Sequence, residues 1–349
     1  MKTLKGYEND YSFERNSDNI ADMVLSGKYL AKRKLKININ EIKIDEYPSE
    51  ERLEYLKQLL AEKYNKNVKH FVLGAASNGI IQNLVKLFFS KGGTLLVSEF
   101  SFPQPEYAVN RIGGNVKKIA TKNFKINFNN FIKEVNEDTK AIFLCNPNNP
   151  TGYYYNPEEI IAFAKKVKNV PVIVSEAAVE FACKSSLLNF DLPENIIVTR
   201  SFSKAYGLAG LRVGFGYLSG KYLEIYQKNI TRFEVSILSI EVAIQMLEAN
   251  DINQNINLVL KERNYLQSEL DKLGIKTLKS DSNAFMSEKK YELSFYELLN
   301  KKGVSVAKVD SDQEGYFYFR VAVQEHKVNK IFIKCLKEIG SKNIKKFER

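Results

Sequence analysis

Short apolar runs alternate with helical patterns between about residues 46 and 240. The runs rich in β-branched and aromatic residues are predicted strands at 70–73, 94–97, 116–119, 141–144, 172–174, 196–198 and 213–216. Apolar residues recur at helical spacing between many of them, as in 79–89, and 157–167 begins with a proline typical of a first helical turn. This alternation predicts an α/β domain with a mostly parallel seven-stranded sheet covered by helices on both faces.

The pattern changes after Val242. A helical run through Leu270 is followed by short apolar segments at 275–278 and 316–323, which predicts a smaller α+β domain. The polar N-terminal stretch contains one helical pattern near 20–30. We therefore expect an N-terminal segment at 1–45 that packs with the small domain, a large domain at 46–240 and a small C-terminal domain at 241–349.

Composition excludes several classes of protein. Hydrophobic residues make up 44% and charged residues 27% of the 349 residues, which is typical of a globular protein and not of a disordered or fibrous one. No apolar run approaches the ~20 residues that span a membrane, and the first residues carry no apolar segment typical of a secretory signal. We expect a cytoplasmic protein without a membrane partner.

Charge and cysteine content favour a small-molecule partner. The net charge is +11, but the 52 basic residues are spread along the chain among 41 acidic ones and form no basic arm, so we expect no nucleic-acid partner. A basic surface suits small phosphorylated substrates. Cys145, Cys183 and Cys335 show no CxxC pairing, so neither a disulfide framework nor a zinc site is predicted, and we expect no metal.

The segment 201–214, which reads SFSKAYGLAGLRVG, contains the strongest candidate chemistry. It follows a predicted strand, and open α/β sheets bind ligands at the carboxyl ends of their strands. The amine of Lys204 belongs to the kind that forms Schiff bases with carbonyl cofactors. The hydroxyls of Ser201 and Ser203 and the guanidinium of Arg212 suit a phosphate. Alone, however, a serine-flanked lysine is more often a surface lysine beside a turn.

Two further turns follow predicted strands. CNPNNPTG at 145–152 contains prolines and asparagines that make a rigid turn and fix an amide at the sheet edge. GAASNG at 74–79 links a strand to a helix, whose first backbone N–H groups can bind phosphate. Each turn alone would be unremarkable, but these turns and the lysine segment occur together in one chain.

Together these segments resemble the fold-type I pyridoxal-phosphate-dependent enzymes. Among these, the chain is most similar to the class I and II aminotransferases near histidinol-phosphate aminotransferase, a branch that includes threonine-phosphate decarboxylase. The resemblance runs from about Tyr47 to Val323. It implies pyridoxal 5′-phosphate as cofactor and a homodimer with shared active sites. Lys204 would hold the cofactor as a Schiff base and carry a proton during catalysis.

The resemblance also implies roles for other residues. The cofactor phosphate would be bound by the backbone of Ala76 and Ser77 and by the side chains of Ser201, Ser203 and Arg212. Phe102 would stack on the pyridine ring, and Asn149 would bind the 3′ oxygen. Tyr47 would reach the phosphate in the partner subunit. Arg320 would bind a carboxylate or phosphate of the substrate.

The chain departs from the family at the cofactor ring. It reads Ser175-Glu176-Ala177-Ala178 where the family has Asp-Glu-Ala-Tyr. The usual Asp pairs with the pyridine nitrogen and keeps it protonated, whereas Ser175 offers a hydrogen bond without charge, so we expect a largely neutral nitrogen. Glu176 is not expected to substitute, because neighbours on a strand point to opposite faces. Ala178 leaves Asn149 as the main partner of the 3′ oxygen.

The N-terminal residues lack the Asn-Glu-Asn-Pro-like string of histidinol-phosphate aminotransferases, which indicates a paralogue with another substrate. We expect an aminotransferase that moves an amino group from glutamate or a similar donor to a small phosphorylated carbonyl compound, such as dihydroxyacetone phosphate or imidazole acetol phosphate. Two alternatives remain open. One is a decarboxylase of phosphoserine or phosphothreonine, and the other is a cofactor-binding paralogue with little or no activity.

Overall fold

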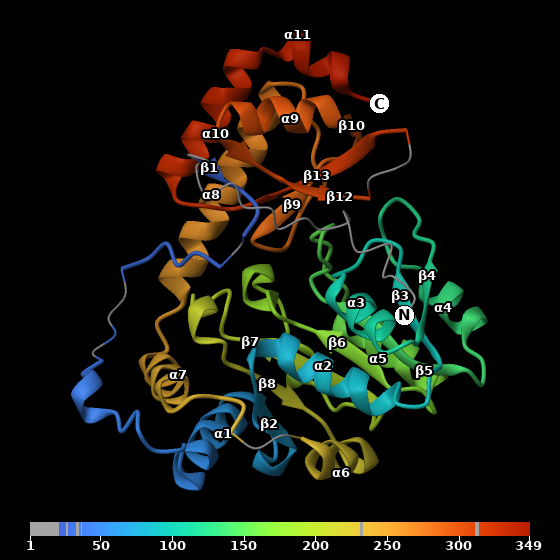
Figure 1. Cartoon of the computed structure of the whole chain (residues 1–349), viewed down its shortest axis with the longest axis vertical. Helices are drawn as coiled ribbons and strands as arrows, with labels where there is room; N and C mark the ends of the chain where they lie inside the picture. Colours follow the sequence, from blue (N-terminus) through green and yellow to red (C-terminus); the bar gives the residue numbers. More distant parts are fainter. Residues whose placement is uncertain (1–20, 26, 33–34, 36, 231–232, 311–313) are drawn as a thin grey trace. The chain divides into compact units, whose positions relative to one another are not determined.

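The computed structural model describes residues 21–25, 27–32, 35, 37–230, 233–310 and 314–349 (Figure 1). The described chain forms two compact units. The larger unit contains 32–149 and 154–253, and the smaller one contains 21–31, 150–153 and 254–349. Within the described residues, no helix is long and apolar enough to cross a membrane.

A seven-stranded sheet forms the centre of the larger unit. Its strands, in spatial order, are β2 (Phe71–Gly74), β8 (Gly214–Tyr217), β7 (Ile196–Ser201), β6 (Val172–Ser175), β5 (Thr139–Cys145), β3 (Thr94–Ser98) and β4 (Asn115–Ile119). Only β8 runs antiparallel to its neighbours in this sheet; the other pairs are parallel. The predicted seven strands and mostly parallel sheet are confirmed.

The helices of the larger unit are α1 (Glu50–Tyr64), α2 (Ala76–Phe88), α3 (Gln104–Arg111), α4 (Phe128–Glu134), α5 (Pro157–Lys166), α6 (Gly220–Asn229) and α7 (Ile237–Ala249). Its 3-10 turns are η1 (Ile39–Glu41), η2 (Val68–His70), η3 (Val179–Ala182), η4 (Leu187–Asn189) and η5 (Ala209–Leu211). As predicted, α5 begins with Pro157, and the Glu159 carboxylate accepts a hydrogen bond from the Asn156 amide at 3.2 Å. This bond satisfies one N–H group at the helix start.

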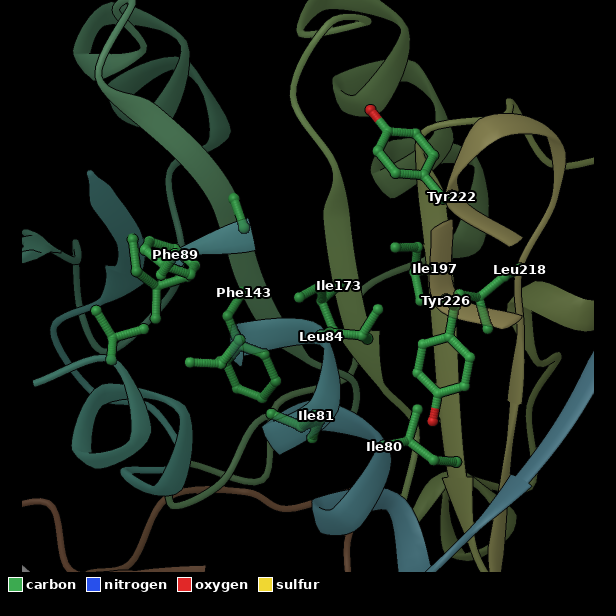
Figure 2. Close-up of a cluster of buried hydrophobic side chains, with 14 of the residues drawn as sticks. Ile80, Ile81, Leu84, Phe89, Phe143, Ile173, Ile197, Leu218, Tyr222 and Tyr226 are labelled. Carbon is green, nitrogen blue, oxygen red and sulfur yellow. The ribbon is translucent and has the colours of Figure 1, made fainter. Parts of the chain in front are cut away.

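The core lies where α2 packs on one face of the sheet (Figure 2). Ile80, Ile81 and Leu84 are fully buried there against side chains such as Phe143 and Ile173. Each such side chain contributes roughly 1.5–3 kcal/mol through burial. Residues two positions apart on a strand share a face. The packing of Phe143 and Ile173 against α2 therefore shows which residues at the strand ends lie on the α2 side of the sheet.

The smaller unit has two sheets. One contains β9 (Ala284–Met286), β10 (Tyr291–Glu292) and β12 (Ala307–Val309), each antiparallel to β13 (Tyr316–Ala322). In the other, β1 (Ala21–Asp22) pairs in parallel with β11 (Val304–Ser305). The accompanying helices are α8 (Asn253–Lys272), α9 (Leu293–Lys301), α10 (His326–Ile339), α11 (Ser341–Ile344) and η6 (Lys345–Phe347).

Three local predictions are wrong. The long helix after Val242 is divided into α7 and α8, because Asn250 adopts a left-handed φ of 44° that ends α7. The segment 275–278 forms only an isolated bridge from Thr277 to Ser287. No helix forms in the described part of 20–30. There β1 pairs with β11, and the amide of Met23 donates to Ser305 at 2.9 Å, so tertiary pairing overrides the helical pattern.

Candidate active site

The loop that carries Lys204 is tightly closed. β7 ends at Ser201, after which the amide of Gly207 donates to the Lys204 carbonyl at 3.0 Å and the amide of Leu208 donates to Phe202 at 2.9 Å. Phe202 is completely buried, whereas Lys204 is half-buried. The apolar anchor therefore holds the lysine at the carboxyl edge of the sheet with access to solvent.

A cluster of hydroxyls and one guanidinium surrounds this loop. Ser201 Oγ accepts a hydrogen bond from the amide of Ser203 at 3.1 Å. Arg212 Nη1 donates to Ser203 Oγ at 3.4 Å and to the Ala209 carbonyl at 3.1 Å. The backbone amide of Ala76 in turn donates to the Arg212 carbonyl at 3.1 Å. The structure thus brings four of the predicted phosphate-binding residues together.

The N-terminus of α2 approaches β8 closely. A Cβ atom on Gly214 would lie 2.6 Å from the backbone carbon of Ala76 and 2.6 Å from the carbonyl oxygen of Arg200, so only glycine fits. Ala75 precedes the helix without forming a side-chain cap, and Ser77 is buried in its first turn. An uncapped helix N-terminus is suited to an anion, because its N–H groups and dipole both favour negative charge.

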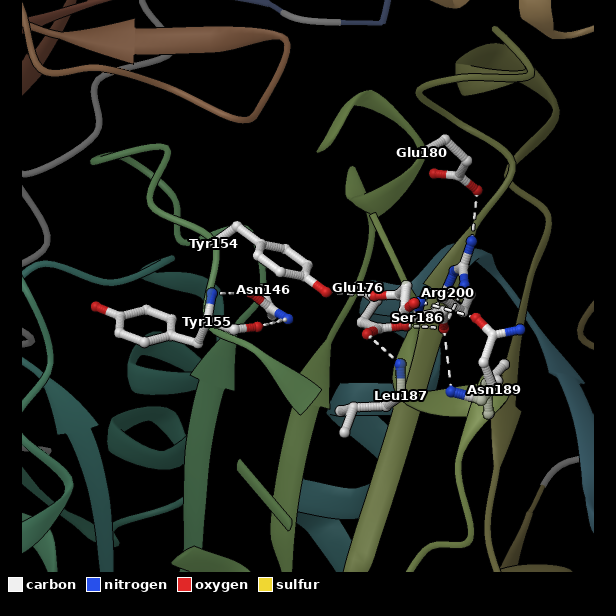
Figure 3. A network of polar contacts seen from close by, with 11 residues as sticks. Asn146, Tyr154, Tyr155, Glu176, Glu180, Ser186, Leu187, Asn189 and Arg200 are labelled. Carbon is white, nitrogen blue, oxygen red and sulfur yellow. Dashed lines mark hydrogen bonds and ion pairs between the residues drawn. The ribbon is translucent and has the colours of Figure 1, made fainter. Parts of the chain in front are cut away.

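The backbones of Phe102 and Asn149 both lie beside the Cys145 thiol. Burial raises the pKa of the Cys145 thiol to about 12, and hydrogen bonds from the backbone of Phe102 and Asn149 partly offset that effect. The turn before Asn149 is held by Asn146, whose side chain donates to the Tyr155 carbonyl at 3.0 Å and accepts from the Tyr155 amide at 2.8 Å (Figure 3). A cis peptide bond follows Asn146.

Three neutral side chains form a row across β5, β6 and β7, at the last residues of β5 and β6 and two residues before the end of β7. Cys145 pairs in register with Ser175, and Ser175 pairs with Thr199. All three are buried, and they lie on the α2 side because Cys145, Ile173 and Ile197 belong to the core beneath that helix. The row contains hydroxyl and thiol groups and no charge.

The opposite face carries a buried ionic network (Figure 3). Glu176 accepts hydrogen bonds from the Ser186 hydroxyl and, at 2.9 Å, from the Leu187 amide. Arg200 lies 3.4 Å from Glu176 and donates to Glu180 at 2.6 Å. The network joins the segment after β6 to the strand that leads to Lys204.

Burial controls the ionisation of this network. It raises the pKa of Glu176, and the Arg200 guanidinium opposes that effect. For Arg200, burial favours the neutral form, but Tyr64, Glu180 and Glu176 more than compensate and raise its pKa, so it stays charged. The expectation that Glu176 points away from Ser175 is confirmed. Sequence reasoning did not predict the role of Arg200. A signal was available, because an arginine near the end of one apolar strand and a glutamate directly after another can form an ion pair.

The residues at this edge fit a polar, phosphate-bearing ligand. Among the described residues, several buried side-chain oxygens lack a hydrogen-bond partner, and four of them lie in segments at or just beyond the carboxyl ends of strands: Asn78 Oδ1, Ser98 Oγ, Ser101 Oγ and Thr199 Oγ1. Buried polar groups are nearly always hydrogen-bonded in folded proteins. These exceptions occur at or after β2, β3 and β7, and they leave polar groups at this edge that a ligand could satisfy.

Two further predicted site residues, Tyr47 and Arg320, belong to other segments of the chain. Tyr47 belongs to the larger unit and is 77% exposed, with its ring centroid 4.5 Å from that of Phe233. It borders a separate pocket of about 380 Å³. Arg320 is on β13 of the smaller unit, where it is buried and donates to the Val24 carbonyl at 3.0 Å. Ala178 is half-buried and precedes η3.

The fold and this loop define a member of the class I and II aminotransferases. The sequence profile of aminotransferase class I and II matches residues 8–334, so the chain belongs to that family, and the resemblance seen in the sequence is confirmed. Pyridoxal 5′-phosphate is the typical cofactor of the class.

Individual relatives are histidinol-phosphate aminotransferases. The enzyme of Caldanaerobacter subterraneus subsp. tengcongensis is 30% identical over 311 residues, which cover 87% of each chain. The crystal structure of the Clostridium acetobutylicum enzyme has a TM-score of 0.79 at 21% identity and covers 93% of this chain and 100% of that one. The Sinorhizobium meliloti enzyme, solved with pyridoxal-5′-phosphate, has a TM-score of 0.75 at 21% identity, covering 85% and 83%. These structures establish the shared fold.

Proposed function

We propose that the chain is a pyridoxal-phosphate-dependent aminotransferase that moves an amino group from glutamate or a similar donor to a small phosphorylated carbonyl compound. Dihydroxyacetone phosphate and imidazole acetol phosphate have the expected size and charge. The observation that carries the proposal is the position of Lys204 on an anchored loop beside Ser203, whose hydroxyl contacts Arg212 at 3.4 Å. Relatives at about 30% identity that act on histidinol phosphate support a phosphorylated substrate.

The residues of the site divide the work of holding the cofactor. The α2 N-terminus with Ala76 and Ser77, together with Ser201, Ser203 and Arg212, would bind the phosphate. Phe102 would cover one face of the ring, and Asn149 would donate to the 3′ oxygen. When bound, the cofactor withdraws electrons from the substrate Cα and so makes its proton acidic.

Lys204 would do the proton chemistry. Its amine, half-buried on the closed loop, would take the proton from Cα and deliver it to the carbon on the other side of the substrate nitrogen. Ser175 contributes no charge, so stabilisation of the developing negative charge would depend on hydrogen bonds. Arg320 would hold the carboxylate or phosphate of the substrate through its planar guanidinium.

The working form would be a homodimer in the cytoplasm. Tyr47 and Phe233 are 77% and 50% exposed, yet their rings contact each other at a tilt of 32°, and exposed paired aromatics are typical of a surface that a partner covers. In such a dimer Tyr47 would reach the phosphate bound by the other subunit.

The test is the absorbance spectrum of the protein loaded with pyridoxal phosphate. We expect a yellow band that glutamate bleaches and a phosphorylated carbonyl acceptor restores. Lys204→Ala should abolish the band and turnover, while Lys228→Ala on the exposed side of α6 should change neither. Turnover by Lys204→Ala would refute the proposal. Release of carbon dioxide from phosphoserine or phosphothreonine without an acceptor would show a decarboxylase, and a yellow protein inert to every donor would show a paralogue without activity.

A further inference from the structure

Two hydroxyls occupy neighbouring strands, with Ser175 at the end of β6 and Thr199 two residues before the end of β7. The strands are parallel, and Ser175 is the register partner of Thr199. Neighbouring strands are about 4.8 Å apart, so two hydroxyls on the same face can turn toward each other and form a hydrogen bond. Ile173 and Ile197, two residues earlier, pack in the core under α2 and place both hydroxyls on that side.

The hydroxyl of Thr199 is the unusual member of this pair. Thr199 is 0% exposed, and its Oγ1 makes no hydrogen bond with any described residue. A buried hydroxyl without a partner costs free energy, and a valine would fill nearly the same space without that cost. The hydroxyl therefore points to a partner that becomes oriented only when the site is filled.

Within the described part of the larger unit, two neighbours of Ser175, Cys145 and Glu176, supply no charge to a ring nitrogen there. The neighbouring Cys145 thiol stays protonated because burial raises its pKa to about 12. Glu176 lies on the other face and is bound by Ser186, Leu187 and Arg200. A neutral pyridine nitrogen accepts a hydrogen bond, so the group it needs from the protein is an oriented O–H donor.

We propose that Thr199 is a positioning residue for Ser175. The Thr199 O–H donates a hydrogen bond to Ser175 Oγ. Because Ser175 Oγ then accepts from Thr199, its own O–H is directed to the ring nitrogen of the cofactor. Two hydroxyls in series thereby replace the carboxylate partner of other pyridoxal-phosphate enzymes. The inference rests on the proposed function, because that function places Ser175 at the ring nitrogen.

The test uses the full chain loaded with pyridoxal phosphate that carries ¹⁵N in its ring. The nitrogen chemical shift reports hydrogen bonding at that atom whether or not the protein turns over. Thr199→Val should move the shift in the same direction as Ser175→Ala, whereas Thr199→Ser, which keeps the hydroxyl, should restore the wild-type value. In the Ser175→Ala background, Thr199→Val should have no further effect, because residues that act through each other are not additive.

Thr139→Val is the matched control. Thr139 is also a buried threonine, but it begins β5 at the opposite edge of the sheet and accepts a bond from the Asn136 amide at 3.1 Å. It should leave the ¹⁵N shift unchanged. Without cofactor, Thr199→Val should unfold at the wild-type temperature or above it, since it removes an unpaired hydroxyl, and this shows that the variant is folded.

The outcomes separate the two proposals. If wild-type protein takes up the cofactor through Lys204 and Thr199→Val shows the wild-type ¹⁵N shift, the positioning role is overturned while the proposed function stands. An effect of Thr199→Val that persists in the Ser175→Ala background also overturns it. If the wild-type protein takes up no cofactor, both proposals fail.

Discussion

The backbone amide of Ala76 donates to the carbonyl of Arg212 across 3.1 Å, at the one point where α2 starts and β8 is about to begin. This bond holds the start of α2 beside Arg212, whose guanidinium we propose binds the cofactor phosphate. Both residues adopt a left-handed φ, 59° for Ala76 and 51° for Arg212. Backbone geometry therefore shapes the proposed phosphate site as much as side chains do.

Gly214→Ala should destabilise the protein because its Cβ would lie 2.6 Å from backbone atoms of Ala76 and Arg200. Overpacking against backbone typically costs about 1–3 kcal/mol, occasionally more, and it should also displace α2 and weaken cofactor binding. Chemical denaturation and cofactor titration measure the two effects. Gly210→Ala, where nothing lies within 4 Å of the new Cβ, is the control. Equal behaviour of the two variants would contradict the close approach.

Arg212→Ala should weaken cofactor binding. Hydrogen bonds to charged groups contribute about 1.5–3 kcal/mol, which corresponds to a roughly 10- to 100-fold rise in the Kd of pyridoxal phosphate. The Kd of Arg212→Lys should lie between those of the wild type and Arg212→Ala, because a lysine ammonium keeps the charge but lacks the planar guanidinium that can form two parallel hydrogen bonds. Fluorescence or absorbance titration checks both. Arg111→Ala at the exposed end of α3 should have no effect, and a Kd unaffected by Arg212→Ala would remove the arginine from the phosphate site.

Glu176→Ala should reduce stability because it removes one partner of the buried Arg200 charge. Breaking a buried pair from one side costs about 3–5 kcal/mol. Urea unfolding should show this loss, whereas Glu134→Ala, which breaks an exposed pair with Lys117, should stay within about 1 kcal/mol. A small effect at Glu176 would mean that Glu180 alone balances the arginine.

The buried thiol of Cys145 predicts a loss of stability at alkaline pH. Its folded pKa is about 12 against an ordinary value of 9.0, so the folded state retains a proton that the unfolded state releases. The stabilisation is fully present below pH 9 and is lost as pH rises toward 12, by roughly 1.4 kcal/mol per pH unit. Between pH 8 and 11, the free energy of unfolding of Cys145→Ala should fall less steeply with pH than that of the wild-type protein. An identical slope would show that other groups, such as Tyr64, dominate.

Tyr47 predicts complementation between subunits. Lys204→Ala and Tyr47→Ala should each be defective alone, but mixing them under conditions of subunit exchange should restore turnover. A mixed dimer would then hold one site with intact Lys204 and intact Tyr47. Sedimentation or light scattering verifies the dimer, and a mixture no more active than its parts would contradict a shared site.

The large sheet was predictable because most of its strands are short apolar runs separated by recognisable turns. The opposed faces of Ser175 and Glu176 followed from strand alternation alone. The pairing of Ser175 with Thr199 did not, because strands separated in sequence reveal no register until they pack. The end of α7 at Asn250 had a usable signal, because asparagine favours the left-handed conformation that ends helices. By contrast, β1 is two residues long and forms only against β11. Strand register and the formation of very short strands depend on pairing between segments far apart in the sequence, and the local hydrophobic pattern does not reveal that pairing.

The alternation at the end of β6 also restricts how this chain could acquire a charged partner for a cofactor ring. Glu176 stands next to the right position, yet moving it there would require a one-residue slip that turns every side chain of the strand over and strips Arg200 of a counter-ion. A point substitution at residue 175 is the accessible route, and it would introduce an acid between a neutral thiol and a neutral hydroxyl. An acidic ring partner would therefore be gained by changing residue 175 alone, while Glu176 remains the counter-ion of Arg200 on the other face.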